Sequence, residues 1–277
     1  MNTIVIVPTY NESEGIVDML DAVLSHAPGV DILVVDDDSP DGTGRLVAAH
    51  REHGVRVHLV TRPSKDGIGA AYRAGFRWAL DRQYDAVVQM DADLSHPPDR
   101  IVALLAALEH HDVAVGSRYV EGGGVRDWPL LRRLISRGGN LYVRAVLGLA
   151  VRDATAGYKA FRRQALEKIG AVDSESNGYC FQIETTWRAS RLGLRTAEVP
   201  IIFRDRRLGT SKMTGAIVGE AMLRVLGWRW RELVRPSGSA LLVFRDPAPD
   251  REESLTSARA EDRPPHRHPT TAPAAPR

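Results

Sequence analysis

The chain has 277 residues, of which 43% are hydrophobic and 26% are charged, and its formal net charge is +2. This length is typical of one large or two small domains, the hydrophobic fraction can build a sizeable core, and the near-neutral charge gives no reason to expect a nucleic-acid partner. The single cysteine, Cys180, excludes an intrachain disulfide and any zinc site built from several cysteines.

The N-terminal residues enter a β-strand pattern directly and lack the basic and then apolar form of a signal peptide. No window approaches the roughly 20 uncharged apolar residues that a membrane-spanning helix needs. We therefore expect a cytoplasmic protein without membrane spans.

The first part of the chain alternates between strands and helices. Strands are expected where β-branched and aliphatic residues run together, at 3–7, 31–35, 56–60, 86–88 and 112–115, and helices where apolar residues recur at helical spacing, at 13–24, 68–80 and 100–109. This alternation predicts an α/β fold with a doubly wound, mostly parallel sheet flanked by helices.

After residue 118 the alternation stops. Helices are expected at 141–151, 179–192 and 216–234, and a strand broken by Pro200 at 196–203. Seven of the 16 prolines lie in the last 41 residues. We therefore expect a catalytic domain over residues 1–236 and a Pro-rich, disordered tail over residues 237–277.

Polar residues gather after each predicted strand, and the carboxyl ends of parallel strands meet at one edge of a sheet, where open α/β sheets bind their ligands. No Gly-x-Gly-x-x-Gly follows the first strand and no Gly-x-x-x-x-Gly-Lys-Ser/Thr occurs, which argues against a dinucleotide-binding Rossmann enzyme and a P-loop protein. The clusters follow the strands in chain order: Tyr10 and Glu12, Asp36 to Asp41, Arg62 and Lys65, Asp91 and Asp93, and Ser117 and Arg118.

Asp91 and Asp93 are separated by one residue in the turn after a buried strand, so both carboxylates can point at one hard cation. Mg²⁺ and Mn²⁺ favour oxygen ligands and are usually held by one or two carboxylates together with substrate phosphates. The alternative is that Asp93 or Ser95 only caps the following helix.

Several ordered motifs between residue 3 and about residue 235 resemble the dolichol-phosphate and polyprenol-phosphate mannosyltransferases, which are inverting glycosyltransferases with the GT-A fold. The motifs are Pro8-Thr9-Tyr10-Asn11-Glu12, Asp36-Asp37-Asp38-Ser39-Pro40-Asp41-Gly42-Thr43, Asp91-Ala92-Asp93-Leu94-Ser95-His96-Pro97, Gly116-Ser117-Arg118-Tyr119, Ser136-Arg137-Gly138, Gly178-Tyr179-Cys180-Phe181-Gln182 and Asp205-Arg206 with Gly209, Ser211 and Lys212.

The resemblance implies transfer of mannose from GDP-mannose to a polyprenyl or dolichyl phosphate with inversion, which gives a β-linked product, and it implies Mg²⁺ or Mn²⁺ as the cofactor. Ser95 stands where some relatives place a glutamine as a third metal ligand, and its shorter side chain leaves room for water there. The implied site residues are Pro8, Tyr10 and Glu12 at the nucleotide, Val35 and Asp37 at the base and ribose, Asp91, Ala92 and Asp93 at the metal and diphosphate, Arg206 and Lys212 over the donor, and Arg118, Arg132 and Ser136 at the acceptor phosphate.

The residue chemistry agrees with this reading. A cation at Asp91 and Asp93 would stabilise the charge that gathers on a leaving diphosphate. The acceptor phosphate already carries about −1.5 to −2 charges, so it needs no strong general base. Arginines suit such an acceptor because their planar fork can bind two phosphate oxygens.

Between Phe203 and Arg235 the chain has eight Lys/Arg against three Asp/Glu, together with two tryptophans. The helix within this stretch could lie on an anionic membrane surface or pack on the sheet with its charges in water. We expect a peripheral protein on the cytoplasmic face of the membrane, held there directly or by a membrane-anchor protein.

Alternative functions are transfer of glucose or N-acetylglucosamine from a UDP-sugar to polyprenyl phosphate, and a non-catalytic subunit that binds nucleotide sugars.

Overall fold

A computed structural model describes residues 1–204, except 175 and 177, and residues 215–234. The described elements belong to one compact unit, Met1–Ala240, while Leu241–Arg277 lies outside the described residues. The expected disordered tail, 237–277, therefore cannot be compared with the structure.

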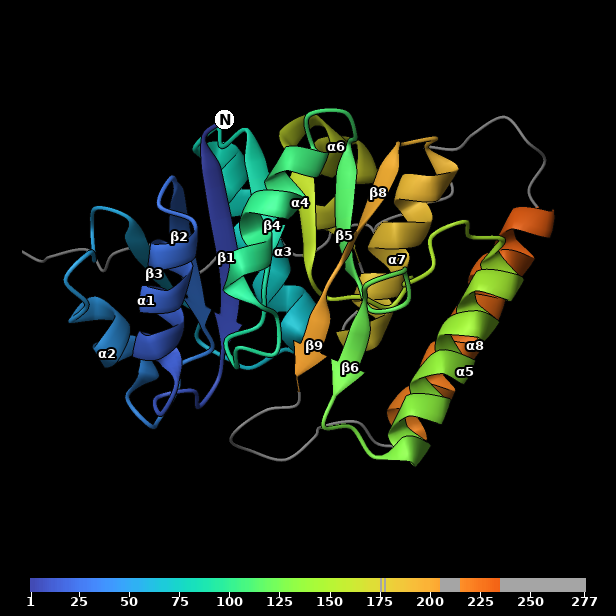
Figure 1. Cartoon of the computed structure of the whole chain (residues 1–277), viewed down its shortest axis with the longest axis horizontal. Helices are drawn as coiled ribbons and strands as arrows, with labels where there is room; N and C mark the ends of the chain where they lie inside the picture. Colours follow the sequence, from blue (N-terminus) through green and yellow to red (C-terminus); the bar gives the residue numbers. More distant parts are fainter. Residues whose placement is uncertain (175, 177, 205–214, 235–277) are drawn as a thin grey trace, which may run out of the picture. The chain divides into compact units, whose positions relative to one another are not determined.

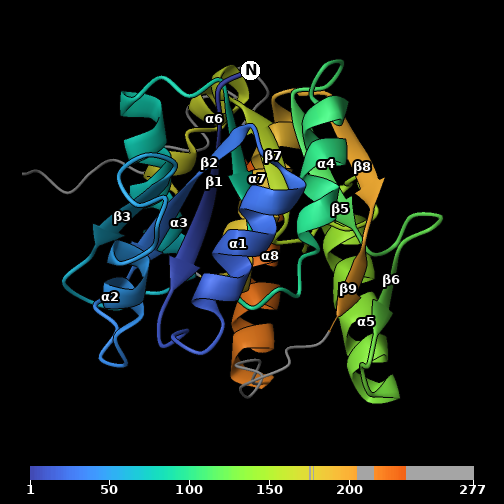
Figure 2. The ribbon, with the colours of Figure 1, turned by 60° about the vertical axis from the view of Figure 1, so that its left-hand side comes forward.

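A seven-stranded sheet runs through this unit in the order β3-β2-β1-β4-β7-β5-β8, with β3 and β8 at its two edges (Figure 2). All neighbouring strands pair in parallel except β7, which is antiparallel to both β4 and β5. A small second sheet pairs β6 with β9 in parallel. The strands are β1 Thr3–Thr9, β2 Val30–Asp36, β3 Val57–Thr61, β4 Ala86–Gln89, β5 Val113–Ser117, β6 Gly124–Arg126, β7 Lys159–Arg162, β8 Thr196–Pro200 and β9 Ile202–Arg204.

Helices cover both faces of the large sheet, as the predicted fold requires, and α1 and α4 lie on the face turned to the viewer in Figure 1. The helices are α1 Ile16–His26, α2 Thr43–Ala48, α3 Ile68–Asp81, α4 Ile101–Ala107, α5 Leu130–Leu147, α6 Arg163–Ile169, α7 Gly178–Arg191 and α8 Gly215–Val234, with short 3-10 turns at Pro98–Arg100 and Ala171–Asp173. Within the part of the chain that the structure describes, no helix is long and apolar enough to cross a membrane.

The alternation of side chains along β1 divides the core into two layers. Val5 and Val7 pack with α1 and α4 on one face, whereas Ile4 and Ile6 pack with α3, α6 and α7 on the other. Gly75 of α3 permits close packing, because a Cβ at this position would lie 2.5 Å from Cγ2 of Ile6. The helix can therefore approach β1 only if this residue has no side chain.

Helices α5 and α8 pack against each other beside the sheet (Figure 1). The Trp187 indole of α7 stacks on Trp228 of α8 at 5.3 Å and donates a hydrogen bond to Glu232 Oε1 at 2.8 Å. Arg191 of α7 also pairs with Glu232. These contacts attach α8, and with it α5, to the helix layer of the sheet.

The predicted elements agree with most of the observed ones, and the differences are the following. The mostly parallel sheet is confirmed, but its antiparallel strand β7 was not among the predicted strands. Helix α5 begins at Leu130 rather than near residue 141, and α2 and α6 were not predicted. The expected strand at 196–203 is present as β8 and β9, separated at Ile201 just after Pro200.

Candidate active site

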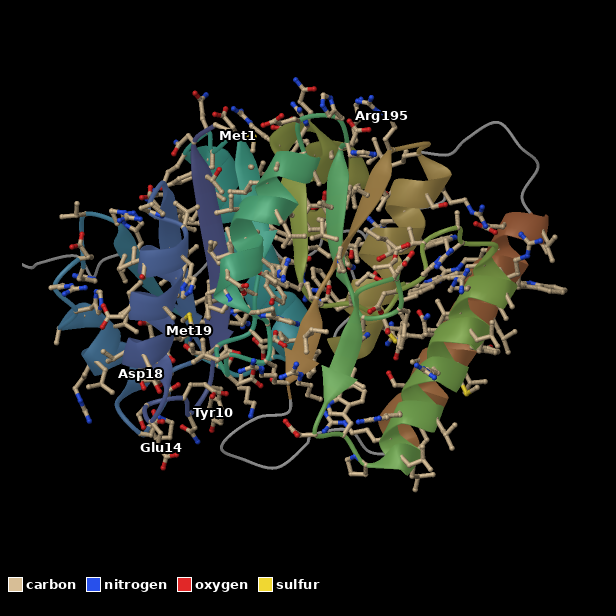
Figure 3. The ribbon with its side chains drawn as sticks, in the orientation of Figure 1. Met1, Tyr10, Glu14, Asp18, Met19 and Arg195 are labelled. Carbon is tan, nitrogen blue, oxygen red and sulfur yellow. The ribbon has the colours of Figure 1, made fainter. Side chains whose placement is uncertain are left out.

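A cavity of about 510 Å³ opens at the carboxyl ends of the parallel strands. Figure 3 shows Tyr10, which follows β1, at the end of the sheet opposite Met1 and Arg195. Because β7 runs antiparallel, the segment that precedes it reaches the same edge as the residues that follow β4 and β5. The antiparallel strand thus adds residues 155–157 to the wall of the cavity.

The acidic turn after β4 is held by short-range contacts. Leu94 has a φ of +58°, an uncommon conformation for a bulky residue, and it allows the turn to reverse sharply. The Ser95 amide donates to Asp93 Oδ1 at 3.0 Å, and the Tyr72 hydroxyl donates to Asp91 Oδ1 at 3.4 Å. Burial and the adjacent Asp91 carboxylate raise the pKa of Tyr72 well above its usual value, so this hydroxyl remains a donor.

The buried side chain of His96 stabilises the same turn. Its Nδ1 accepts a hydrogen bond from the Asp91 amide at 3.1 Å, and its ring stacks on Tyr158 at 4.9 Å. Complete burial lowers the pKa of His96 even though the carboxylates of Asp91 and Asp93 act in the opposite direction. The imidazole is therefore neutral, and its contact with Asp91 Oδ2 at 3.9 Å is not an ion pair.

The turn fits a divalent cation that also binds phosphate. Asp91 and Asp93 both line the cavity, and the Ser95 hydroxyl beside them is buried without a hydrogen-bond partner among the described residues. Among all the residues that the structure describes, there is no cluster of three or more His, Cys, Asp or Glu side chains that could hold a metal. Two carboxylates with a nearby hydroxyl are the donor set of a cation that completes its coordination with substrate oxygens and water.

A second group of residues lines the cavity near β1 and β2. The Lys65 ammonium lies 3.6 Å from the centre of the Tyr10 ring, and Arg62 pairs with Asp37 at 2.6 Å. Burial raises the pKa of Asp37, and the charge and hydrogen bond of Arg62 offset only part of that effect. An aromatic ring beside a partly buried carboxylate can bind a base and the hydroxyls of a ribose.

The third group is basic and centres on Arg118. Its Nε and Nη2 donate to the two carboxylate oxygens of Asp153 at 2.7 Å each, and Nη2 also donates to Thr155 Oγ1 at 2.9 Å. Burial raises the pKa of Asp153, but the charge and hydrogen bonds of Arg118 outweigh burial, so the pKa lies below its usual value. Arg118 is therefore fixed in orientation at the cavity wall by a fully buried carboxylate.

Helix α5 supplies the rest of this basic group. The Arg132 guanidinium lies 4.2 Å from the centre of the Trp128 ring, and Ser136 shares a hydrogen bond of 2.7 Å with the Tyr119 hydroxyl. Asn140 of the same helix accepts from the Ala154 amide at 2.9 Å and donates to the Arg152 carbonyl. One helix thus positions both the cavity wall and the segment that carries the carboxylate partner of Arg118.

The structure brings most of the predicted site residues together. Val35 is an exception, because its side chain is fully buried in the core near Gly75 and does not line the cavity. Arg206 and Lys212 lie outside the described residues. The predicted residues that line the cavity are Pro8, Tyr10, Glu12, Asp37, Asp91, Ala92, Asp93, Ser95, Arg118, Arg132 and Ser136.

Several residues of this site were not assigned a role from the sequence, among them Asp153, His96, Gln182 and Gly157. Asp153 gave no signal, because a lone carboxylate in an irregular stretch is usually a surface residue. His96 and Gln182 fell inside motifs of the resemblance without a role, and Gly157 lies in a segment that only β7 brings to this edge.

The fold and the site define a glycosyltransferase of the GT-A class. Glucosyl-3-phosphoglycerate synthase from Mycobacterium tuberculosis, solved in complex with Mn²⁺, UDP and glucosyl-3-phosphoglycerate, has the same fold, with a TM-score of 0.59 and 22% identity over 86% of this chain and 82% of that one. Residues 4–170 match the model of glycosyl transferase family 2, and the chain belongs to that family.

Two relatives of known name cover most of this chain. Polyprenol monophosphomannose synthase from Mycolicibacterium smegmatis is 50% identical over 228 residues, which are 82% of this chain and 86% of that protein. Undecaprenyl-phosphate mannosyltransferase from Micrococcus luteus is 48% identical over 237 residues, which are 84% of this chain and 98% of that protein.

Proposed function

We propose that this protein transfers mannose from GDP-mannose to the phosphate of a polyprenyl monophosphate, with inversion at the anomeric carbon. The observation that carries the proposal is that one cavity contains both the Asp91–Asp93 turn and the basic group of Arg118 and Arg132. A displacement between two phosphates needs sites for both the leaving and the attacking anion. The names of the two relatives support mannose as the sugar and a polyprenyl phosphate as the acceptor.

We assign the leaving diphosphate to the acidic turn. Asp91 and Asp93 would hold Mg²⁺ or Mn²⁺ there, and the ion would supply charge stabilisation to the departing GDP. His96 orients the turn through the Asp91 amide. Tyr10 and Asp37 would contact the nucleoside, next to the Lys65 ammonium.

We assign the acceptor phosphate to Arg118, Arg132 and Ser136. The phosphate is itself the nucleophile, so the protein's contribution is to orient it and to exclude water, and no general base is assigned. Asp153 keeps the Arg118 guanidinium in a single orientation, and its carboxylate offsets the positive charge of that group.

A transfer assay with purified protein tests the proposal. The protein is incubated with a polyprenyl phosphate, Mg²⁺ or Mn²⁺, and GDP-mannose, UDP-glucose or UDP-N-acetylglucosamine in parallel. We expect mannosyl lipid from GDP-mannose. Glucosyl or N-acetylglucosaminyl lipid instead would support the UDP-sugar alternative, and nucleotide-sugar binding without transfer from any donor would support a non-catalytic subunit.

We also expect a chain that ends at residue 236 to retain transfer, if residues 1–236 form the catalytic domain.

The acceptor's isoprenoid tail remains in a bilayer, so we propose that the α5–α8 pair contacts the cytoplasmic membrane surface. Leu223 and Trp230 of α8 are 72% and 68% exposed, and Leu130 and Leu134 of α5 are also exposed. Two exposed arginines also lie on α5: Arg133 between the two leucines, and Arg137 after Leu134. Exposed apolar side chains with nearby arginines suit a surface of anionic lipid.

Vesicle flotation tests this contact. The wild-type protein should bind vesicles that contain anionic lipid, and Leu223→Asp should bind less. Val55→Asp is the matched control, because Val55 is 69% exposed but follows α2 on the chain, away from α5 and α8. Equal binding by wild type and Leu223→Asp would exclude this surface and favour a separate membrane-anchor protein.

A further inference from the structure

The carboxamide of Gln182 lies at the cavity with an unsatisfied oxygen. The residue is 5% exposed and lines the cavity, and its Oε1 is buried without a hydrogen-bond partner in the described part of the chain. Buried amide oxygens in proteins are usually paired, and one left unpaired is costly. An unpaired amide at the wall of a substrate cavity is therefore suited to bind a ligand.

The backbone of Gln182 is held firmly at the start of α7. Its carbonyl accepts hydrogen bonds from Lys159 Nζ at 2.6 Å, Thr186 Oγ1 at 3.0 Å and Thr185 Oγ1 at 3.1 Å. Lys159 is fully buried in β7, so the sheet itself fixes this turn of the helix. The side chain therefore projects from a fixed point of the scaffold.

Gly157 locates the carboxamide within the cavity. A Cβ at this glycine would lie 3.7 Å from Gln182 Nε2 and 3.5 Å from Cε1 of His96. His96 accepts from the Asp91 amide, and Thr155, two residues before Gly157, accepts from Arg118. Gln182 thus lies where the acidic turn and the basic group come together. The absence of a side chain at Gly157 leaves space beside it.

We propose that Gln182 determines sugar specificity by hydrogen bonding to hydroxyl groups of the transferred hexose. The inference rests on the proposed function, in which the sugar must lie between the leaving diphosphate at Asp91 and Asp93 and the attacking phosphate at Arg118. A hydroxyl can donate to Oε1 and accept from Nε2, whereas a fully ionised phosphate oxygen can only accept and is repelled by Oε1. The carboxamide therefore matches a sugar better than either phosphate.

Binding and transfer by Gln182→Leu test the proposal. Leucine keeps the approximate size and removes both polar atoms. We expect its affinity for GDP, measured by calorimetry with Mg²⁺, to stay within about twofold of wild type, because GDP has no hexose. Its affinity for GDP-mannose, and the kcat/KM ratio of GDP-mannose to GDP-glucose, should each fall about tenfold, the cost of a lost hydrogen bond to a substrate hydroxyl.

Gln89→Leu is the matched control. Gln89 is fully buried, and neither polar atom of its carboxamide has a hydrogen-bond partner among the described residues, but it does not line the cavity. This variant should keep the wild-type preference between the two donors. Gln182→Glu is the second variant if leucine impairs folding, because it keeps the side-chain shape and replaces the amide donor with an acceptor.

The outcomes separate this inference from the proposed function. Wild-type protein that transfers no sugar would refute the proposed function, and the comparison of GDP with GDP-mannose binding would still test Gln182. Unchanged donor preference in a folded Gln182 variant would overturn the inference while wild-type transfer stands. Equal losses of GDP and GDP-mannose affinity, together with a lower Tm, would show that Gln182 is only structural.

Discussion

The buried pair of Arg118 and Asp153 offers a stability test that does not depend on knowing the substrate. Asp153 is 0% exposed, the Arg118 side chain is 10% exposed, and the two groups share two hydrogen bonds of 2.7 Å. The Arg118 amide also donates to Asp153 Oδ2 at 2.9 Å. Asp153→Asn keeps the size of the side chain, removes its charge and places an amide donor against a guanidinium.

Breaking a buried pair by removing one partner costs about 3–5 kcal/mol, because the remaining charge is left without compensation. One hydrogen bond can survive in Asp153→Asn, so we expect a loss of about 3 kcal/mol in the free energy of unfolding. For a domain of this size that corresponds to a fall in Tm of roughly 6–12 °C. Urea unfolding and calorimetry at pH 7 measure both quantities.

The pH dependence supplies an independent signature. Since the pKa of folded Asp153 lies below its unfolded value, its contribution is complete above the unfolded pKa and is lost as the pH falls through the folded pKa. The difference between wild type and Asp153→Asn should therefore shrink below about pH 4.

Glu167→Gln is the control for this experiment, because its pair with Arg163 lies on a helix surface and contributes about 0.5 kcal/mol or less. If Asp153→Asn costs no more than Glu167→Gln, the buried pair does not stabilise the fold as described. A double-mutant cycle that combines Asp153→Asn with Arg118→Met should also show strong coupling in the free energy of unfolding. Additive effects of the two substitutions would contradict a direct pairing.

Two further predictions concern the core. Burial lowers the pKa of Lys159 to about 7, so between pH 7 and 10 the unfolded chain binds a proton that the folded protein does not. The free energy of unfolding of the wild type, relative to that of Lys159→Met, should then rise by up to about 1.4 kcal/mol per pH unit. Urea unfolding that gives the same difference between the two proteins at pH 7 and at pH 9 would contradict this. Gly75→Ala should destabilise the protein by about 1–3 kcal/mol, because its Cβ would meet Ile6. Gly138→Ala has open space around it and should stabilise the protein by about 0.5–1 kcal/mol. If both variants changed the Tm in the same direction, close packing at Gly75 would be refuted.

The sequence was sufficient to predict the parallel part of the sheet and much of the cavity. The strands before the Tyr10, Asp37 and Asp91 turns are rich in β-branched residues and almost entirely buried, which is typical of parallel strands whose carboxyl ends meet at one edge. Runs of apolar residues with polar clusters after them are the signals that local sequence carries well.

The remaining features depend on contacts between distant segments. Strand β7 is short and carries the buried Lys159, whose partner atoms lie in α7, so its pattern does not indicate an interior strand. Helix α5 leaves several leucines exposed, so its first turns lack the apolar stripe of a packed helix. Asp153 is fully buried and pairs with Arg118, which lies 35 residues earlier in the chain, and no local signal marks such a pair.

In the proposed reaction, the Asp91–Asp93 turn enables mannose to leave GDP for a lipid phosphate. The most direct measurement is transfer of radiolabelled mannose from GDP-mannose to polyprenyl phosphate with Mg²⁺ or Mn²⁺, comparing wild type with Asp91→Ala. The wild type should form an acid-labile mannosyl lipid, and Asp91→Ala should lose at least about 100-fold in rate because the departing diphosphate lacks its stabilising charge. A folded Asp91→Ala protein that transfers mannose at the wild-type rate would show that this turn does not assist the departure of GDP.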